Sequence, residues 1–179
     1  MAIMLATSFT LAAYGQAKAD KKLSRDYEIS KGFTLGIENT YGDINIVNWD
    51  EDALSVVVTV EVEATSQSKA DKLLESVNIE IDESSNSVFF ETEFEKQNYN
   101  EKKKIRITYD VKTPAYMNVE LEQAYGNVYI QELTGTADLE IKYSSLTADA
   151  LMVEDNDEWN SLELKYGDAT IGKVNGLDA

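Results

Sequence analysis

The sequence predicts an all-β, solenoid-like fold, because one short pattern recurs along the chain. A Tyr-Gly pair stands three times between two alternating apolar runs, in IENTYGDINI (37–46), VELEQAYGNVYI (119–130) and LELKYGDATI (162–171). Alternating apolar and polar residues are typical of a strand with one buried face, and glycine is frequent in tight turns. The repeated strand, turn and strand therefore indicates a stacked β-protein rather than an enzyme built around a cleft.

The first half of the chain begins with a polar lead-in over residues 20–31. Alternating apolar residues on both sides of Tyr41 and Gly42 then predict the first strand pair. Residues 54–64 (LSVVVTVEVEA) are rich in β-branched side chains and predict a long strand with one face in solvent. These three segments come before the only expected helix.

One short helix is predicted near residues 66–77, with Ser66 or Ser68 as its N-cap. Its apolar residues recur at helical spacing, namely Ala70, Leu73, Leu74 and Val77. A hairpin is expected next, with strands at 78–82 and 87–94 around the turn 83–86. A polar loop (95–103) and an alternating strand (104–112) complete this half.

The second half repeats more densely, with units that align around Tyr125, Tyr143 and Tyr166. The second interval is longer than the first, and its additional residues fall in an acidic insertion at 154–160. We expect the tyrosines to stack in a ladder, one per unit. We expect the glycines after them (Gly42, Gly126 and Gly167) to supply a positive φ. Ser144 replaces glycine in the middle unit and predicts a corner of another type.

Three segments are expected along the chain: a signal peptide (1–19), an N-terminal β-rich half with the short helix (20–114) and solenoid units (115–179). Residues 3–13 form an apolar run of the length of a signal-peptide core, although no lysine or arginine precedes it. The single proline, Pro114, marks the boundary between the halves. No later segment is apolar enough to span a membrane, so we expect an exported protein.

Composition excludes several classes of function. The chain has 33 acidic and 16 basic residues, a net charge of −17, which repels nucleic-acid phosphates. The absence of cysteine excludes disulfides and thiol catalysis, and the absence of histidine excludes the usual general base and the commonest zinc ligand. The charge itself is typical of a solvated surface that keeps a β-protein soluble, or of a surface that attracts cations or a basic partner.

The acidic insertion is the most site-like stretch, since clustered carboxylate oxygens are the ligands that Ca²⁺ prefers. Its candidate metal ligands are Asp155, Asp157 and Glu158. The spacing departs from the EF-hand loop, because Trp159 stands where the loop glycine belongs. A solvated acidic loop is the alternative, and no other cofactor is expected.

Two further sets of residues are surface candidates. Asp43, Asn127 and Asp168 follow the three corner glycines and should line up on neighbouring units. A glycosidase needs two carboxylates, and Asn127 carries none, so only Asp43 and Asp168 could form such a pair. The alternative is that these residues have the ordinary role of Asp and Asn in turns. Exposed aromatic residues could form a carbohydrate-stacking surface or could cap the edges of the core: Trp49, Tyr99, Tyr116, Tyr129 and Trp159.

The chain resembles the secreted bacterial adhesin family of the DUF4097 type, which is β-helical and related to head-domain adhesins. The resemblance is carried by three stretches, FTLGIENTYGDINIVNWDEDALSVVVTVEV (33–62), SKADKLLESVNIEI (68–81) and KIRITYDVKTPAYMNVELEQAYGNVYI (104–130), and by the closing units. The corner at Tyr143-Ser144 departs from the pattern. The resemblance implies export, a right-handed parallel β-helix and a surface role, and it supplies no catalytic residues.

The function expected from these observations is that of a non-enzymatic, exported adhesin-like or scaffold domain, which binds a protein or a glycan at the bacterial cell surface or in the periplasm. One alternative is a carbohydrate-active enzyme on a β-helix, which requires a concave carboxylate site. Another is a periplasmic sensor or regulatory partner. The sequence leaves the ligand and the oligomeric state open.

Overall fold

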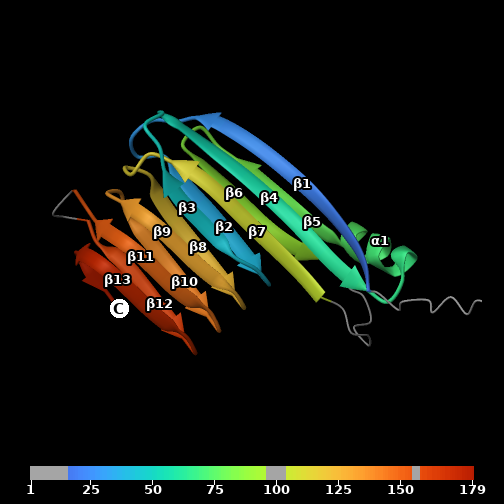
Figure 1. The fold of residues 1–179 in the computed structure, drawn as a ribbon. Coiled ribbons are helices and arrows are strands. Elements are labelled where there is room, and N and C mark those ends of the chain that lie inside the picture. Colours follow the sequence, from blue (N-terminus) through green and yellow to red (C-terminus); the bar gives the residue numbers. More distant parts are fainter. Residues whose placement is uncertain (1–15, 96–103, 155–157) are drawn as a thin grey trace, which may run out of the picture.

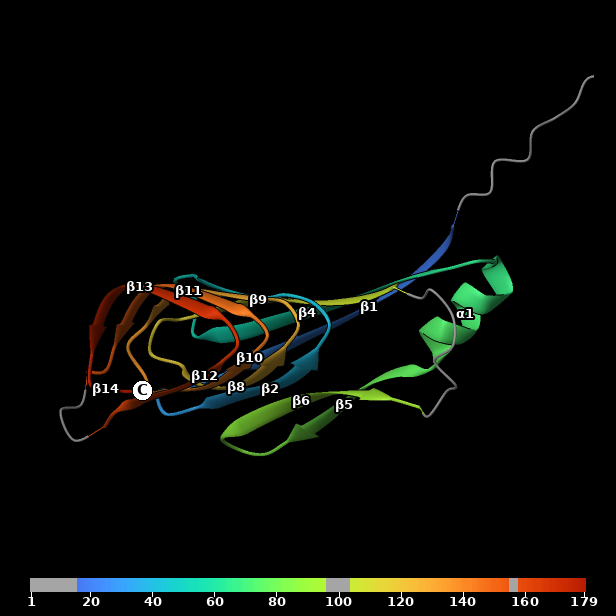
Figure 2. The ribbon, with the colours of Figure 1, turned by 90° about the horizontal axis from the view of Figure 1, so that it is seen from below.

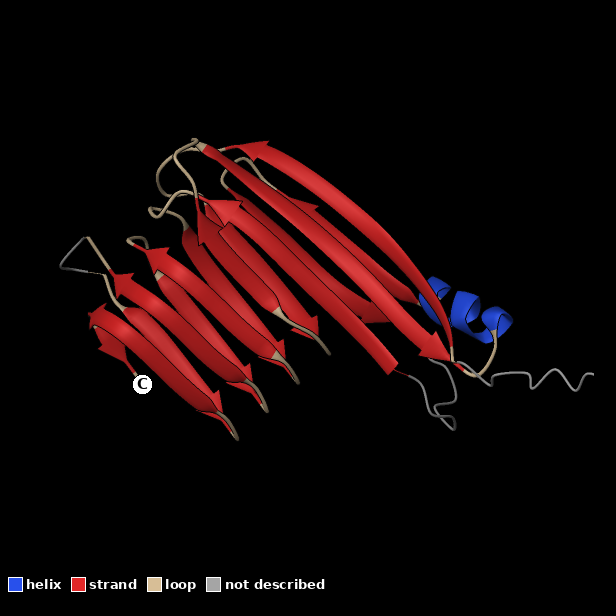
Figure 3. Cartoon of the chain, viewed as in Figure 1, coloured by secondary structure: helices blue, strands red, loops and turns tan. Residues whose placement is uncertain are grey.

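The computed structural model describes residues 16–95, 104–154 and 158–179, which form two β-sheets and one short helix (Figures 1 and 3). The prediction of a β-protein with a single short helix is confirmed. Sheet A contains, in spatial order, β1 (Ala17–Glu28), β4 (Ala53–Ala64), β7 (Lys104–Thr113), β3 (Ile44–Asn48), β9 (Asn127–Leu133), β11 (Ser145–Met152) and β13 (Asp168–Asn175). Sheet B contains β14 (Leu177–Asp178), β12 (Asn160–Lys165), β10 (Ala137–Lys142), β8 (Asn118–Ala124), β2 (Thr34–Thr40), β6 (Ser87–Phe94) and β5 (Val77–Glu83).

The two sheets face each other as layers, and the core lies between them (Figure 2). Alternate residues of each strand point inward, so the alternation in the sequence becomes continuous apolar rows in space. In sheet B, one such row joins Ile81, Phe90, Ile37, Leu121, Leu139 and Leu162 on neighbouring strands. Burial of these rows from water is the main stabilising contribution to the fold.

Four units, which we call rungs, repeat in the stack. A rung is a strand of sheet B, a corner that begins with tyrosine, and the next strand of sheet A: β2–β3, β8–β9, β10–β11 and β12–β13. Each rung pairs with its neighbour in parallel and in register within both sheets. Strands β8 to β14 thus alternate regularly between sheet B and sheet A.

The other end of the stack is built from antiparallel strands. β1, β4 and β7 pair antiparallel in sheet A, and β5 and β6 form the expected hairpin in sheet B. The helix α1 (Gln67–Glu75) lies at this end against β1 and β4 (Figure 2), where it buries Ala70 and Leu73. Ser66 occupies the predicted N-cap position with an extended backbone, and its side chain makes no capping hydrogen bond.

The polar lead-in expected over residues 20–31 is a strand for most of its length, because β1 pairs with β4 from Ala17 to Glu28. β1 lies at the edge of sheet A, and its inward residues are only half buried. Because these positions do not require apolar side chains, the strand can be polar in composition. Lys21 is one of these inward residues, and its ammonium group donates to the carbonyl oxygen of Val77. Backbone pairing, rather than an apolar pattern, therefore defines this strand.

Both sheets run across the expected boundary at Pro114. The first rung lies before this residue and pairs directly with the second rung, which lies after it, through β2 with β8 and β3 with β9. The division at Pro114 stays a prediction about folding units. The signal peptide also stays a prediction, since residues 1–15 lie outside the described part of the chain.

No helix in the described ranges is both long enough and apolar enough to cross a bilayer.

Candidate functional site

The four rung corners share one unusual backbone conformation. Tyr41, Tyr125, Tyr143 and Tyr166 have φ angles of 71°, 58°, 52° and 57°, in the left-handed region that bulky residues rarely adopt. Each such residue costs about 1 kcal/mol of backbone strain. Four consecutive corners with the same costly conformation are therefore a feature that the rest of the stack must stabilise.

Stacking of the four rings provides part of that stabilisation. The ring centroids of Tyr41 and Tyr125 are 5.5 Å apart, those of Tyr125 and Tyr143 are 5.0 Å apart, and those of Tyr143 and Tyr166 are 4.9 Å apart. The interplanar angles are 22°, 2° and 7°, so the rings are nearly parallel. The predicted tyrosine ladder is confirmed, and it includes Tyr41 from the first half of the chain. Stacked pairs of this kind contribute about 1 kcal/mol each beyond burial.

The expected role of the corner glycines is largely wrong. Gly126 and Gly167 have no positive φ, and Gly42, at 157°, lies at the margin of extended backbone. A Cβ on Gly126 would lie 1.6 Å from the carbonyl oxygen of Gly42, and one on Gly167 would lie 1.9 Å from that of Ser144. Glycine is present because successive corners approach each other closely, while the preceding tyrosine takes the left-handed conformation.

Ser144 does not create a different corner, contrary to expectation. Tyr143 before it has the same positive φ as the other three tyrosines. The Ser144 hydroxyl accepts a hydrogen bond from the Gly126 amide at 3.1 Å and donates one to the Lys142 carbonyl at 2.9 Å. This side chain therefore links its own rung to the preceding one.

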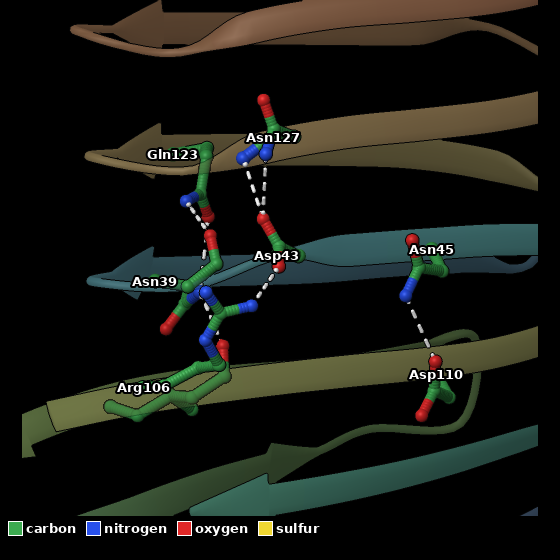
Figure 4. A network of polar contacts seen from close by, with 9 residues as sticks. Asn39, Asp43, Asn45, Arg106, Asp110, Gln123 and Asn127 are labelled. Carbon is green, nitrogen blue, oxygen red and sulfur yellow. Dashed lines mark hydrogen bonds and ion pairs between the residues drawn. The ribbon is translucent and has the colours of Figure 1, made fainter. Parts of the chain in front are cut away.

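Asp43, two residues after Tyr41, lies between Asn127 and Arg106 in a network of polar contacts (Figure 4). Its Oδ1 accepts hydrogen bonds from the backbone amide and the side-chain amide of Asn127, both at 3.0 Å. Its Oδ2 lies 2.9 Å from Arg106 Nη1 in an ion pair. The Asp43 carboxylate therefore joins the first rung to β9 on one side and to β7 on the other.

The possible glycosidase pair does not have the required geometry. Asp43 and Asp168 belong to the first and the fourth rung, three strand spacings apart. Three spacings amount to about 14 Å, whereas the two carboxyl groups of a glycosidase lie about 5 to 10 Å apart. The Asp43 carboxylate bonds Asn127 and Arg106 rather than its own turn, and Asp168 is the first residue of β13, so the turn role predicted as the alternative stays a prediction for Asp168.

A buried chain of polar groups crosses the core below the ladder, and sequence reasoning missed it. The Tyr109 hydroxyl lies 2.9 Å from Thr92 Oγ1, which donates to Asn39 Oδ1 at 3.3 Å. Asn39 Nδ2 donates to Gln123 Oε1 at 3.1 Å, and Gln123 Nε2 donates to the Gly42 carbonyl at 2.7 Å. Burial raises the pKa of Tyr109 to about 12. The sequence does contain a signal for this buried chain. Asn39 and Gln123 stand two residues after Ile37 and Leu121, so the alternation of the strand predicts that these polar side chains also point inward.

The predicted calcium site is not tested by the structure. Asp155 and Asp157 lie outside the described residues, and Glu158 is exposed. Glu154, at the start of the insertion, pairs with Lys31 at 2.7 Å, which lowers the pKa of its carboxyl group. Within the residues that the structure describes, no group of three or more acidic side chains is arranged to hold a metal ion.

The described members of the predicted aromatic surface make no ring contacts with one another. The Tyr116 hydroxyl donates to Asp52 at 2.7 Å, and that of Tyr129 donates to Asp149 at 2.8 Å. The Trp49 indole donates to the Ala53 carbonyl at 2.8 Å. Trp159 is 64% exposed, and Tyr99 lies outside the described part. In the ladder, the rings of Tyr125 and Tyr143 are each stacked between two neighbours, whereas Tyr166 stacks on Tyr143 alone.

The outer face of sheet B carries a continuous row of carboxylates, which we call the glutamate row. It contains one glutamate from each of six adjacent strands, in register: Glu80, Glu91, Glu38, Glu122, Glu140 and Glu163. Partial burial raises the pKa of Glu38, and the charges of Glu122 and Glu91 raise it further. Glu140 pairs with Lys142 at 3.2 Å, and Glu163 pairs with Lys165. The first four members have no such partner among the described residues.

A shallow groove lies beside the glutamate row. It has a volume of about 150 Å³ and includes Phe89, Ile37 and Leu121 together with acidic side chains. The Phe89 ring lies against Gly36, where a Cβ would be 2.0 Å from the ring, and 40% of the Phe89 residue surface is exposed. This face therefore combines negative charge with a local apolar contact.

A second depression, with a volume of about 690 Å³, lies on β1, β4 and β7 near Tyr41. Four of its charged side chains form ion pairs, and one of these is Arg106, which pairs with Asp43. Glu63 contacts Lys18 at 2.8 Å and Lys104 at 3.3 Å, and these contacts lower the pKa of the Glu63 carboxyl group.

Comparison with known proteins gives distant structural similarity only. No family model and no curated protein matches the chain. A solved structure described as a putative cell adhesion protein from Clostridium sporogenes is similar at 10% identity and a TM-score of 0.38, over 89% of this chain and 99% of that one. A putative adhesin from Bacteroides fragilis is similar at 16% identity and a TM-score of 0.32, over 88% and 72%. One from Parabacteroides merdae is similar at 14% identity and a TM-score of 0.30, over 80% and 52%. Membership of the DUF4097-type family stays a prediction.

Proposed function

We propose that this protein is a non-enzymatic, exported adhesin-like or scaffold module of a bacterial envelope, built as a right-handed β-solenoid. Its outer sheet B face would bind the partner. The observation that supports this proposal is the glutamate row, a set of like charges in register across six strands of sheet B.

Like charges on directly opposed residues of neighbouring strands destabilise a sheet by several tenths of a kcal/mol per pair. The row sets Glu80 opposite Glu91, Glu91 opposite Glu38, and Glu38 opposite Glu122. Among the described residues, lysine forms ion pairs with Glu140 and Glu163, and the charge of Lys142 also offsets part of the rise in the pKa of Glu38. A cationic partner would remove the repulsion that remains.

The chemistry of this face favours a basic protein surface over a neutral glycan. Carboxylates pair strongly with arginine and lysine, and Phe89 next to Gly36 adds an apolar contact. The strands that carry Glu80, Glu91, Glu38 and Glu122 are hydrogen-bonded within the sheet. Binding therefore requires little ordering of the backbone, and this lowers its entropic cost.

A charge-matched pair of variants tests the proposal. The triple variant Glu38→Gln/Glu91→Gln/Glu122→Gln removes three charges from the row, and Glu51→Gln/Glu75→Gln/Glu132→Gln removes three exposed charges elsewhere. We expect binding of an octa-lysine peptide, measured by calorimetry at two salt concentrations, to weaken at least tenfold in the first variant and much less in the second. Equal weakening in both variants would show that only net charge matters and would reject the sheet face as the binding surface.

The proposed location needs its own experiment. Protease treatment of intact cells, followed by mass spectrometry, should release peptides such as the one that ends at Lys165 if the domain is outside. Release only after the outer membrane is broken would favour a periplasmic scaffold or sensor. Turnover of a glycan that Asp168→Ala abolishes would overturn the assignment as a non-enzyme.

A further inference from the structure

We propose that the tyrosine ladder is a site of oxidative modification, at which a one-electron oxidant joins neighbouring rungs through a dityrosine cross-link. The inference does not depend on the proposed binding function. It follows from the spacing, exposure and backbone restraint of Tyr41, Tyr125, Tyr143 and Tyr166.

The spacing brings equivalent atoms of neighbouring phenols together. The rings of Tyr125 and Tyr143 deviate from parallel by 2°, those of Tyr143 and Tyr166 by 7°, and they extend from equivalent corners. The ortho carbons of neighbours therefore lie about as far apart as the ring centres, which are separated by 5.0 and 4.9 Å. A small movement of half-exposed side chains brings these carbons into contact.

The ladder is also accessible to an oxidant in solution. The exposed fractions of Tyr41, Tyr125, Tyr143 and Tyr166 are 45%, 52%, 51% and 78%. Their hydroxyl groups make no hydrogen bond within the described residues. By contrast, the hydroxyl groups of Tyr27, Tyr116 and Tyr129 each donate to a carboxylate, and none of these three rings stacks on another described ring.

The backbone keeps the phenols adjacent after oxidation. The amide of Tyr41 donates to the Ala124 carbonyl at 3.0 Å, that of Tyr125 to the Lys142 carbonyl at 3.2 Å, and that of Tyr143 to the Lys165 carbonyl at 2.9 Å. Each corner is thus fixed to the next one. Two radicals held in this way react as if at a very high local concentration.

The chemical step balances with hydrogen peroxide and a haem peroxidase as the oxidant. Two phenols each lose one electron and one proton, and the two radicals form one carbon–carbon bond between ortho positions. The ortho hydrogens then move to oxygen, which restores both aromatic rings. The two electrons and two protons reduce one peroxide molecule to two water molecules, so the protein loses two hydrogen atoms.

Two double variants with the same number of ladder phenols isolate adjacency as the cause. Tyr41→Phe/Tyr166→Phe keeps the neighbouring pair Tyr125 and Tyr143. Tyr125→Phe/Tyr166→Phe keeps Tyr41 and Tyr143, which are separated by a phenylalanine ring. Both variants retain four stacked aromatic rings, and circular dichroism with thermal melting confirms that both are folded.

The experiment treats the wild type and both variants with peroxidase and peroxide, and measures dityrosine fluorescence and the mass of tryptic cross-linked peptides. We expect a dityrosine within one chain in the wild type and in the adjacent-pair variant, at a yield independent of protein concentration. The separated-pair variant should give at least tenfold less. Equal yields in both variants, or a cross-link that maps outside the ladder, would overturn the proposal. The same yield from protein unfolded in urea would also overturn it.

Discussion

At the scale of single residues, the rung corner divides two requirements between two neighbours. Tyr125 takes the left-handed backbone conformation, and Gly126 after it allows the Gly42 carbonyl to approach. The sequence predicts the repeated corner and the ring stack, because the Tyr-Gly pair recurs visibly. It does not reveal which residue takes the positive φ, since the close approach exists only after two rungs have stacked.

This division makes Gly126→Ala strongly destabilising for a steric reason alone. The added Cβ would meet backbone that cannot move without shifting a neighbouring rung, so we expect the free energy of unfolding to fall by about 3 kcal/mol. Urea denaturation measures the change. Gly32→Ala is the control, because its Cβ would meet open space and only the φ of 88° costs energy, about 1 kcal/mol. A smaller loss at Gly126 than at Gly32 would contradict the argument.

At the scale of strands, the glutamate row is a product of register. Its members come from six strands, and the sequence shows them only as separate acidic residues in alternating runs. The row can be recognised only when the pairing of the strands is known, and the sequence alone does not give that pairing. β1 was missed for a related reason, since an edge strand with half-buried side chains lacks an apolar pattern.

We expect Glu38→Gln to stabilise the protein by about 0.5 kcal/mol at neutral pH, because it removes like-charge repulsion from both neighbouring strands. The raised pKa of Glu38 fixes the pH dependence. In the pH range between the ordinary and the raised pKa, the folded state binds more protons than the unfolded state, so the stability of the wild type falls as pH rises.

Thermal melts from pH 4 to neutral pH test this prediction. The difference in melting temperature between Glu38→Gln and the wild type should grow as pH rises through the raised pKa of Glu38. Glu132→Gln serves as the control, since Glu132 is exposed on sheet A and is not part of the row. A difference that shrinks with rising pH would show that Glu38 is stabilised as a carboxylate.

At the scale of the whole molecule, repetition predicted the stack but not its connectivity. The first rung, with its corner at Tyr41, pairs with the rung whose corner is at Tyr125, far along the chain, because β4, α1, β5, β6 and β7 intervene. Those elements pack on the other side of the first rung and close that end with antiparallel strands. Alternation identified most of the strands in this segment, and only long-range pairing places them.

The net charge of −17 predicts how salt affects the whole molecule. Added sodium chloride screens repulsion among the excess carboxylates, and it also weakens ion pairs such as that between Lys31 and Glu154. Repulsion should dominate, so we expect the melting temperature to rise by about 3 °C between low salt and about 0.5 M salt. Scanning calorimetry across a salt series measures this change, and a falling melting temperature would show that the ion pairs dominate.

The parallel rungs also determine how the molecule responds to mechanical force. The hydrogen bonds between rungs run along the stack, so a pull on β13, the last strand of sheet A among the described residues, breaks one strand interface before it loads the next. Each rupture frees the segment from one corner to the next, such as that from Tyr143 to Tyr166 and then that from Tyr125 to Tyr143. Fully extended, these two segments span about 80 and about 60 Å. Under tension, the stack would lengthen in discrete steps, and each step would dissipate energy as one strand interface breaks.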